Sequence, residues 1–118
     1  MDYSQLSDFE INKRVFKAIV GAKPLGYPHN ADGRSAGNES NGNYRWYDYC
    51  NNPEDAWPII TENKISIMFD STDTRYEGEY HEWCDAISSC QKFGIQHQSN
   101  PLRAAMIVFL MMQDANNA

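Results

Sequence analysis

The clearest pattern of apolar and polar positions lies near the end of the chain, in the sequence NPLRAAMIVFLMMQDANNA. Nine apolar residues follow one another over residues 104–112. Asn100 is a typical N-cap and Pro101 a typical first helical residue, so the pattern predicts a helix that begins at Pro101. Nine helical residues rise only about 14 Å, whereas a membrane span needs about 20 residues. The run therefore predicts a buried core helix or an interface helix, and no membrane anchor.

The beginning of the chain carries a complete helix start. Ser7 can cap the helix and Glu10 follows three residues later, which makes a capping box. The sequence predicts a helix over residues 8–20 with Gly21 as its stop. The apolar positions at helical spacing, which we expect to form its buried stripe, are Ile11, Val15, Ala18 and Ile19.

A second helix is predicted from Pro53, where Asn52 provides the cap. Pro58 lacks the amide that an interior helical hydrogen bond needs, so we expect a kink or a restart there. Enrichment in aromatic residues, or alternation of apolar and polar residues, predicts strands at residues 44–49, 64–69 and 79–87.

Two polar segments separate these elements. Residues 21–43 are rich in Gly, Asn, Ser and Asp, and structureless loops above about 12–15 residues are uncommon in compact domains. We expect either a mobile loop or a hairpin with a disordered tip there, with a flexible insertion over about residues 26–43. Residues 88–99 predict another polar loop.

The predicted order is helix, strand, helix, strand, strand, helix. A small antiparallel sheet with helices packed on it is the economical arrangement, which is an α+β fold. The length of 118 residues suits a single domain, residues 1–118. Because the last helix is apolar nearly all round, we expect it to lie centrally or to form a homodimer.

Composition and charge narrow the classes of function. Hydrophobic residues make up 42% of the chain, enough for one core, and the formal net charge is −6. Such an acidic surface repels phosphate backbones, so nucleic acid is disfavoured as a partner. The acidic surface suits either solubility or a basic protein partner. The N-terminus lacks the regions of a signal peptide, and three cysteines fit free thiols in a reducing cytoplasm.

Three segments of the chain together resemble a known family. They are YSQLSDFEINKRV, CNNPEDAWPIITENKISI and NPLRAAMIVFLMMQDANNA. The family that they resemble is the NinX-type family of small proteins from lambdoid phages and prophages. The last segment also resembles the helix that ends phage α/β/α sandwich domains. The resemblance implies a phage or prophage protein in the host bacterial cytoplasm, with a three-layer arrangement of helices on either side of a small sheet. It implies no catalytic residues, and residues 26–43 depart from the family pattern.

The sequence offers few candidate residues for metal binding or catalysis. His81 and Cys84 would point to opposite faces of the strand at residues 79–87, so they do not suit one metal site. The segment DSTDTRYEGE lacks the spacing of an EF-hand, and we interpret it as a solvated turn. Its acidic face would consist of Asp70, Asp73 and Glu77. The chain has no nucleophile elbow and no phosphate loop, so we expect no metal, no cofactor and no catalytic residue.

The aromatic residues are the strongest functional candidates. One interpretation is ordinary core and sheet packing. The other is a binding surface, because Trp, Tyr and Arg dominate interaction sites. The candidate binding residues are Tyr44, Arg45, Trp46, Tyr47, Tyr49 and Trp83. Arg34 or Arg75 could reach this cluster from loops.

These observations give two functional hypotheses. The first is a non-enzymatic phage accessory protein that binds a host protein through an acidic face and exposed aromatics near residues 44–49. Countering host defence or altering host regulation is the role that the family resemblance implies. The alternative is a small-molecule, nucleotide-like binding protein with a pocket of the same aromatics and Arg45. An enzyme is the least favoured class.

Overall fold

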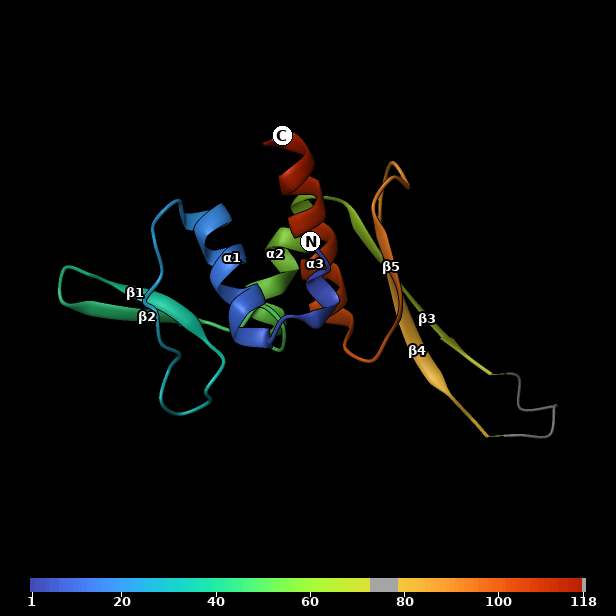
Figure 1. The fold of residues 1–118 in the computed structure, drawn as a ribbon, viewed down its shortest axis with the longest axis horizontal. Coiled ribbons are helices and arrows are strands. Elements are labelled where there is room, and N and C mark those ends of the chain that lie inside the picture. Colours follow the sequence, from blue (N-terminus) through green and yellow to red (C-terminus); the bar gives the residue numbers. More distant parts are fainter. Residues whose placement is uncertain (73–78, 118) are drawn as a thin grey trace.

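The computed structural model describes residues 1–72 and 79–117 of the chain. Within these residues, three α-helices form a centre that lies between two small antiparallel sheets (Figure 1). The longest axis of the molecule measures 57 Å, against 34 Å and 24 Å for the other two, and a sheet lies toward each end of it. The expected α+β class is confirmed, but the single predicted sheet is two sheets.

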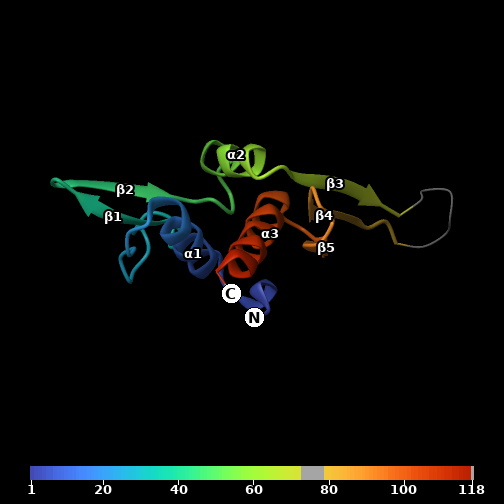
Figure 2. The same cartoon turned by 90° about the horizontal axis from the view of Figure 1, so that it is seen from above.

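The elements follow in the order η1 (Tyr3–Gln5), α1 (Asp8–Val20), β1 (Ala36–Ser40), β2 (Asn43–Tyr47), α2 (Pro53–Glu62), β3 (Ile65–Ser71), β4 (Glu82–Ser88), β5 (Gly94–Gln98) and α3 (Pro101–Asn116). β1 and β2 form a hairpin, and β3, β4 and β5 form the larger sheet in that order. The helices are therefore the middle layer, with a sheet on either side (Figure 2). The expected sandwich instead had helices on either side of one sheet.

α1 begins and ends where the sequence predicts. The Ser7 hydroxyl oxygen accepts the Glu10 amide at 3.2 Å, and Gly21 ends the helix with a φ of 78°. The buried face, however, consists of Ile11, Asn12, Val15 and Phe16. Ala18 and Ile19 are exposed, because α3 and the hairpin approach α1 from the side of Asn12 and Phe16.

α2 begins at Pro53, and the side chain of Asn52 accepts the Glu54 amide at 3.0 Å. The helix runs through Pro58 to Glu62, so it does not restart at the proline. The carbonyl that Pro58 leaves without an intrahelical donor belongs to Glu54. Because Glu54 is exposed in the first turn, water can satisfy that carbonyl.

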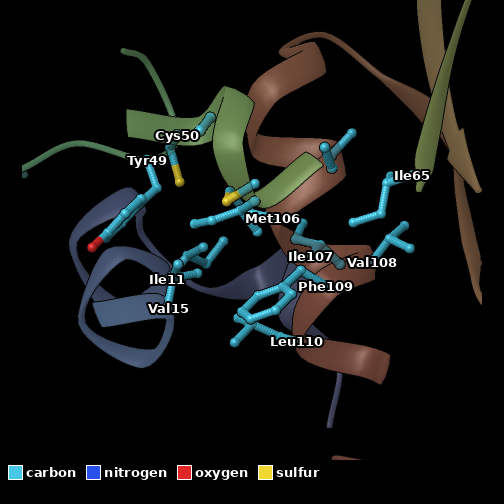
Figure 3. Packing of buried hydrophobic residues seen from close by; sticks show 14 of the residues in the cluster. Ile11, Val15, Tyr49, Cys50, Ile65, Met106, Ile107, Val108, Phe109 and Leu110 are labelled. Carbon is cyan, nitrogen blue, oxygen red and sulfur yellow. The ribbon is translucent and has the colours of Figure 1, made fainter. Parts of the chain in front are cut away.

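α3 is the central helix of the core. Residues 104–110 are at most 4% exposed, and the helix contacts α1, α2 and all three strands of the larger sheet. Figure 3 shows Met106 on the side of Ile11 and Cys50, and Val108 on the side of Ile65. The apolar surface that we considered for a homodimer is thus covered within one chain. In the described residues, no helix combines the length and the apolar character needed to span a membrane.

The Gly/Asn-rich segment contains a hairpin, which was one of the two predicted alternatives. Asn41 and Gly42 form its tip with φ values of 53° and 81°, as a two-residue type I′ turn requires. Gly37 lies opposite Trp46, and a Cβ atom on Gly37 would lie 1.7 Å from the carbonyl oxygen of Arg45. Only glycine fits this position. The flexibility expected for residues 26–43 stays a prediction.

The predicted polar loop at residues 88–99 instead contains β5, which pairs with β4. The pairing shifts register between Cys84 and Ala86, and His97 has a φ of 56°. β5 is also short and mostly solvent-facing. Ile95 is its single apolar side chain, so the strand gives no apolar alternation. This edge position explains why the sequence pattern missed it.

Candidate functional site

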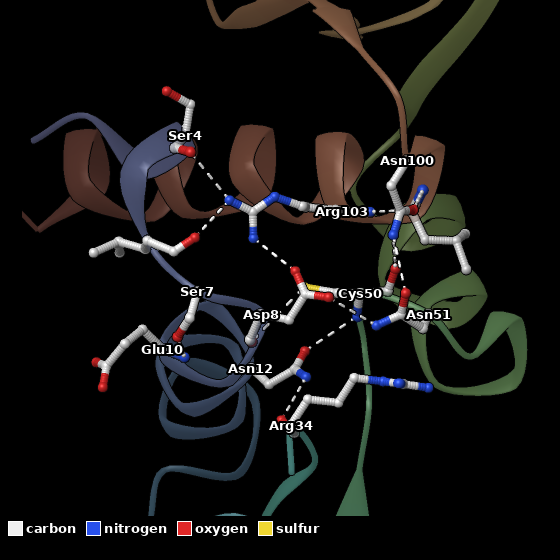
Figure 4. A network of polar contacts seen from close by, with 12 residues as sticks. Ser4, Ser7, Asp8, Glu10, Asn12, Arg34, Cys50, Asn51, Asn100 and Arg103 are labelled. Atoms are coloured by element: carbon white, nitrogen blue, oxygen red, sulfur yellow. Dashed lines mark hydrogen bonds and ion pairs between the residues drawn. The ribbon is translucent and has the colours of Figure 1, made fainter. Parts of the chain in front are cut away.

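A buried polar network joins the hairpin to the helical centre. Asn12 of α1 is fully buried, and its Nδ2 donates to the carbonyl of Arg34 at 3.0 Å and to Asp48 Oδ1 at 2.9 Å. Its Oδ1 accepts the Cys50 amide at 3.1 Å (Figure 4). The Arg34 guanidinium also donates to the Asp48 carboxylate. One buried side chain thus holds both ends of the hairpin segment.

The network continues to α3. Arg103 donates to Asp8 Oδ1 at 2.7 Å and to the carbonyl of Leu6 at 2.6 Å. Asn100 caps α3 and donates to the carbonyl of Cys50 at 2.8 Å (Figure 4). Among the described residues, no buried polar side-chain atom lacks a partner. We interpret the network as a structural junction, because fully satisfied buried polar groups fix one arrangement.

Beyond this junction, the hairpin carries an aromatic surface formed by Tyr27, His29, Tyr44 and Trp46. Tyr44 and Trp46 stack with ring centroids 6.3 Å apart and an interplanar angle of 7°. His29 meets the Trp46 ring edge-on at 5.2 Å, and Tyr27 lies 6.4 Å from it. Tyr44 and Tyr27 are 57% and 55% exposed. Trp46 is therefore the centre of a ring cluster that remains open to solvent.

Two shallow hollows meet at Trp46. The first has a volume of about 290 Å³ and is lined by the four rings of the aromatic surface with Pro28 and Asn30. The second has a volume of about 310 Å³, and its ionisable lining side chains are Asp32, Arg34, Asp48 and Asp55. Three carboxyl groups against one guanidinium give the second hollow a net negative charge when all are ionised. We call it the acidic hollow.

Burial and hydrogen bonds change the pKa values of the groups that line the acidic hollow. Partial burial raises the pKa of Asp55, and the nearby Asp48 charge acts in the same direction. For Asp32, burial acts to raise the pKa, but hydrogen bonds from Ser35 and from the Arg34 amide outweigh it and lower the pKa. The hydrogen bond to Asp48 raises the pKa of Arg34. The guanidinium therefore stays charged and neutralises part of the hollow.

The structure divides the six predicted binding residues among several places. Tyr44 and Trp46 share the aromatic surface, whereas Tyr47 turns inward and packs on Phe16, with ring centroids 5.9 Å apart. Tyr49 is buried in the core and stacks on Tyr47. Arg45 is exposed, but strand alternation places it on the face opposite Tyr44 and Trp46. The pocket expected from the aromatics together with Arg45 does not form.

The remaining predicted residues lie on the larger sheet. Trp83 is half-buried on β4, where it stacks on His97 with ring centroids 5.0 Å apart. Asp70 is exposed near the end of β3. The predicted acidic face also included Asp73 and Glu77, which lie outside the described residues. Asp70 and the aromatic surface are on different sheets at opposite ends of the molecule, so they form no continuous surface (Figure 1).

Comparison with known proteins identifies the family. The sequence profile described as Bacteriophage P22, NinX matches residues 2–113, nearly the whole chain. The chain belongs to the NinX family. The matched range includes residues 26–43, which we had expected to depart from the family pattern. No curated protein and no solved structure matches the chain. Family membership supports a phage accessory protein and assigns no mechanism.

In this NinX-family chain, the three cysteines are free thiols in different environments. Cys50 and Cys84 are buried, and Cys90 is exposed. Burial raises the pKa of Cys50 well above its usual range, and it also raises the pKa of Cys84. Buried thiols with raised pKa values are poor nucleophiles, so these two residues act as small apolar groups of the core.

Sequence reasoning missed the residues that complete this surface of the NinX-family protein. Tyr27 and His29 lie in the segment for which we expected a mobile loop or a hairpin, and Asp32 and Asp55 were not among the predicted binding residues. The Asn41–Gly42 pair was the available signal, because Asn-Gly is the strongest short hairpin motif. It predicts that β2 folds back on β1, which brings residues 27–35 beside Trp46.

Proposed function

We propose that this chain is a non-enzymatic phage accessory protein that binds a host protein in the bacterial cytoplasm through the aromatic surface. The observation that supports this proposal most is the exposed stack of Tyr44 on Trp46, flanked by Tyr27 and His29. Trp and Tyr are enriched among the residues that carry most of the binding energy at protein interfaces. The hairpin that carries Tyr44 and Trp46 extends away from the helical centre (Figure 1).

The adjoining acidic hollow defines the chemistry of the partner. An aliphatic or aromatic side chain would fit the aromatic hollow, and a Lys or Arg beside it would reach Asp32 and Asp55. The overall charge of −6 also attracts a basic surface over longer distances. Membership of a phage family favours a role in countering host defence or altering host regulation.

Affinity capture from host lysate with matched variants tests this proposal. We expect the wild-type protein to enrich one specific host protein, and Trp46→Ala to reduce that enrichment at least tenfold, as expected for an interface hot spot. Tyr80→Ala is the control, because Tyr80 is 56% exposed, as Tyr44 is 57% exposed, but lies outside the hairpin. Equal capture by the wild type, Trp46→Ala and Tyr44→Ala would contradict the proposal.

A nucleotide-like ligand is the alternative that the aromatic hollow allows, because planar rings can stack on Trp46 and Tyr44. The hollow holds no Arg or Lys, and the neighbouring Arg34 is already paired with Asp48, which weakens the case for an anionic ligand. Thermal unfolding with millimolar AMP and GMP distinguishes a nucleotide-like ligand from a host protein partner. A rise in melting temperature with no partner present, lost in Trp46→Ala, would favour the ligand.

A further inference from the structure

The two edges of the larger sheet differ in how well they are protected. β5 forms one edge, and it is short, irregular in register and bent at His97. β3 forms the other edge with seven residues, ISIMFDS, that contain no proline and no charged residue before Asp70. Natural sheets usually blunt a free edge with charges, bulges or proline. β3 carries none of these devices over its first five residues.

The backbone of β3 can form hydrogen bonds with another strand along this edge. The Thr72 amide donates to the carbonyl of His81 at 2.9 Å, so even-numbered residues direct their backbone groups to β4. The amides and carbonyls of Ile65, Ile67 and Phe69 therefore point to the other side. Within residues 1–72 and 79–117, no strand pairs with that side.

The side chains at this edge leave an apolar groove open. Ile65, Ile67 and Phe69 share the face that packs toward α3, but exposure increases along the strand until Phe69 is 75% exposed. The groove has a volume of about 770 Å³, and α2 contributes Trp57, which is 60% exposed. Figure 2 shows α2 beyond the start of β3, on the side away from β4 and β5.

We propose that a second copy of this chain occupies the groove, in a two-fold dimer in which the β3 strands pair antiparallel about Ile67. In this register Ile67 lies opposite its own copy and Ile65 lies opposite the partner's Phe69. Each exposed phenylalanine then enters the apolar groove beside Trp57 of the other copy. The two larger sheets become one continuous sheet across the dimer.

Charge complementarity specifies this register. The ionisable side chains at the edge are Lys64, directly before β3, and Asp70, near its end. Pairing about Ile67 brings Lys64, in the turn just before β3, to the partner's Asp70 twice, once on each side of the two-fold axis. Lys64 has a φ of 56° and its Nζ donates to the Thr61 carbonyl at 3.0 Å, so the amine exchanges that carbonyl for the partner's carboxylate in the dimer.

A shift of the pairing by two residues separates these charges in both directions. Phe69 then lies opposite Asn63 in one direction and opposite Ile67 in the other, so the charges, and not the apolar side chains alone, select the pairing about Ile67.

The mass in solution tests the dimer, without any host protein and independently of the aromatic surface. Sedimentation equilibrium of the full chain from about 1 to 100 µM should give twice the protomer mass of 13.5 kDa at the upper concentrations. Phe69→Lys should give the protomer mass throughout. Ile19→Lys is the matched control, because Ile19 is 48% exposed on α1, away from the edge, and this variant should dimerise as the wild type does.

A charge exchange tests the register. Lys64→Glu or Asp70→Lys alone should weaken the dimer roughly tenfold, because each places like charges together at two symmetric positions. The double variant Lys64→Glu/Asp70→Lys should restore it, with circular dichroism confirming the fold in each case. A wild-type protomer mass up to 100 µM, or a dimer that Phe69→Lys leaves intact, would overturn the proposal. Failure of the double variant to recover would overturn the register.

Discussion

The two sheets of this NinX-family protein are attached to the same helical centre by opposite kinds of contact. The larger sheet rests on α3 through buried apolar side chains, such as Val108 of α3 on the side of Ile65 of β3 (Figure 3). The β1–β2 hairpin is attached at its base by Asn12, Asp48 and Arg34 as well as by Tyr47. Apolar contacts tolerate small shifts, whereas hydrogen bonds to a buried amide fix direction. The polar attachment thus holds the aromatic surface in one orientation.

Removal of apolar contact on α3 should have the largest effect. Ile107 is fully buried, so Ile107→Ala should lower the free energy of unfolding by about 3–4 kcal/mol, through lost burial and a cavity. Urea denaturation followed by circular dichroism measures this loss. Tyr44→Ala, on the exposed surface, should change it by less than about 0.5 kcal/mol. Similar losses for both variants would show that α3 does not dominate the stability.

The part of the fold that was predictable from sequence is the part encoded locally. The Ser7–Glu10 capping box and the two Asn–Pro starts define their helices within a few residues, and all three helices begin where predicted. Which of the aromatic side chains are buried and which are exposed was not predictable. Neighbouring Trp46 and Tyr47 have similar chemistry, and only the position of Phe16 on α1 decides which ring turns inward.

A change at Asn12 tests the polar attachment. Asn12→Ala should lower the free energy of unfolding by about 2–3 kcal/mol, because the Cys50 amide and the Arg34 carbonyl lose a buried partner. Asn38→Ala is the control, since Asn38 is only half-buried on β1, and it should cost less than about 0.5 kcal/mol. Equal effects at Asn12 and Asn38 would mean that the network is not what holds the hairpin.

A glycine-to-alanine substitution in each sheet compares how tightly the backbones of the two sheets are packed. Gly37→Ala should destabilise the hairpin by about 2 kcal/mol, because the new Cβ would overlap the Arg45 carbonyl oxygen at 1.7 Å. Gly94→Ala in β5 should cost less, since its Cβ would lie 3.2 Å from the carbonyl oxygen of Ala86. The indole NMR signal of Trp46 should shift in the first variant and stay in place in the second. The reverse order of effects would contradict the hairpin geometry.

Acid should weaken the hairpin side through Asp32, and this is the smallest expected effect. The pKa of Asp32 lies below its usual value of 3.8, so protonation favours the unfolded state. Its stabilising contribution is present above about pH 4 and is lost as the pH falls through the lowered pKa. Asp32→Asn should remove this part of the pH dependence, measured by urea denaturation between pH 5 and 2.5. An unchanged pH profile would show that Asp32 does not contribute.

The central place of α3 also determines when this protein can fold during its synthesis. α1, α2 and the strands of the larger sheet all pack on α3, yet α3 leaves the ribosome after every one of them. The Arg103–Asp8 ion pair closes only at that point, across 95 positions of sequence. Until then, the apolar faces of the earlier elements have no partner. Protection of nascent chains from protease should therefore appear only once residue 116 has left the exit tunnel.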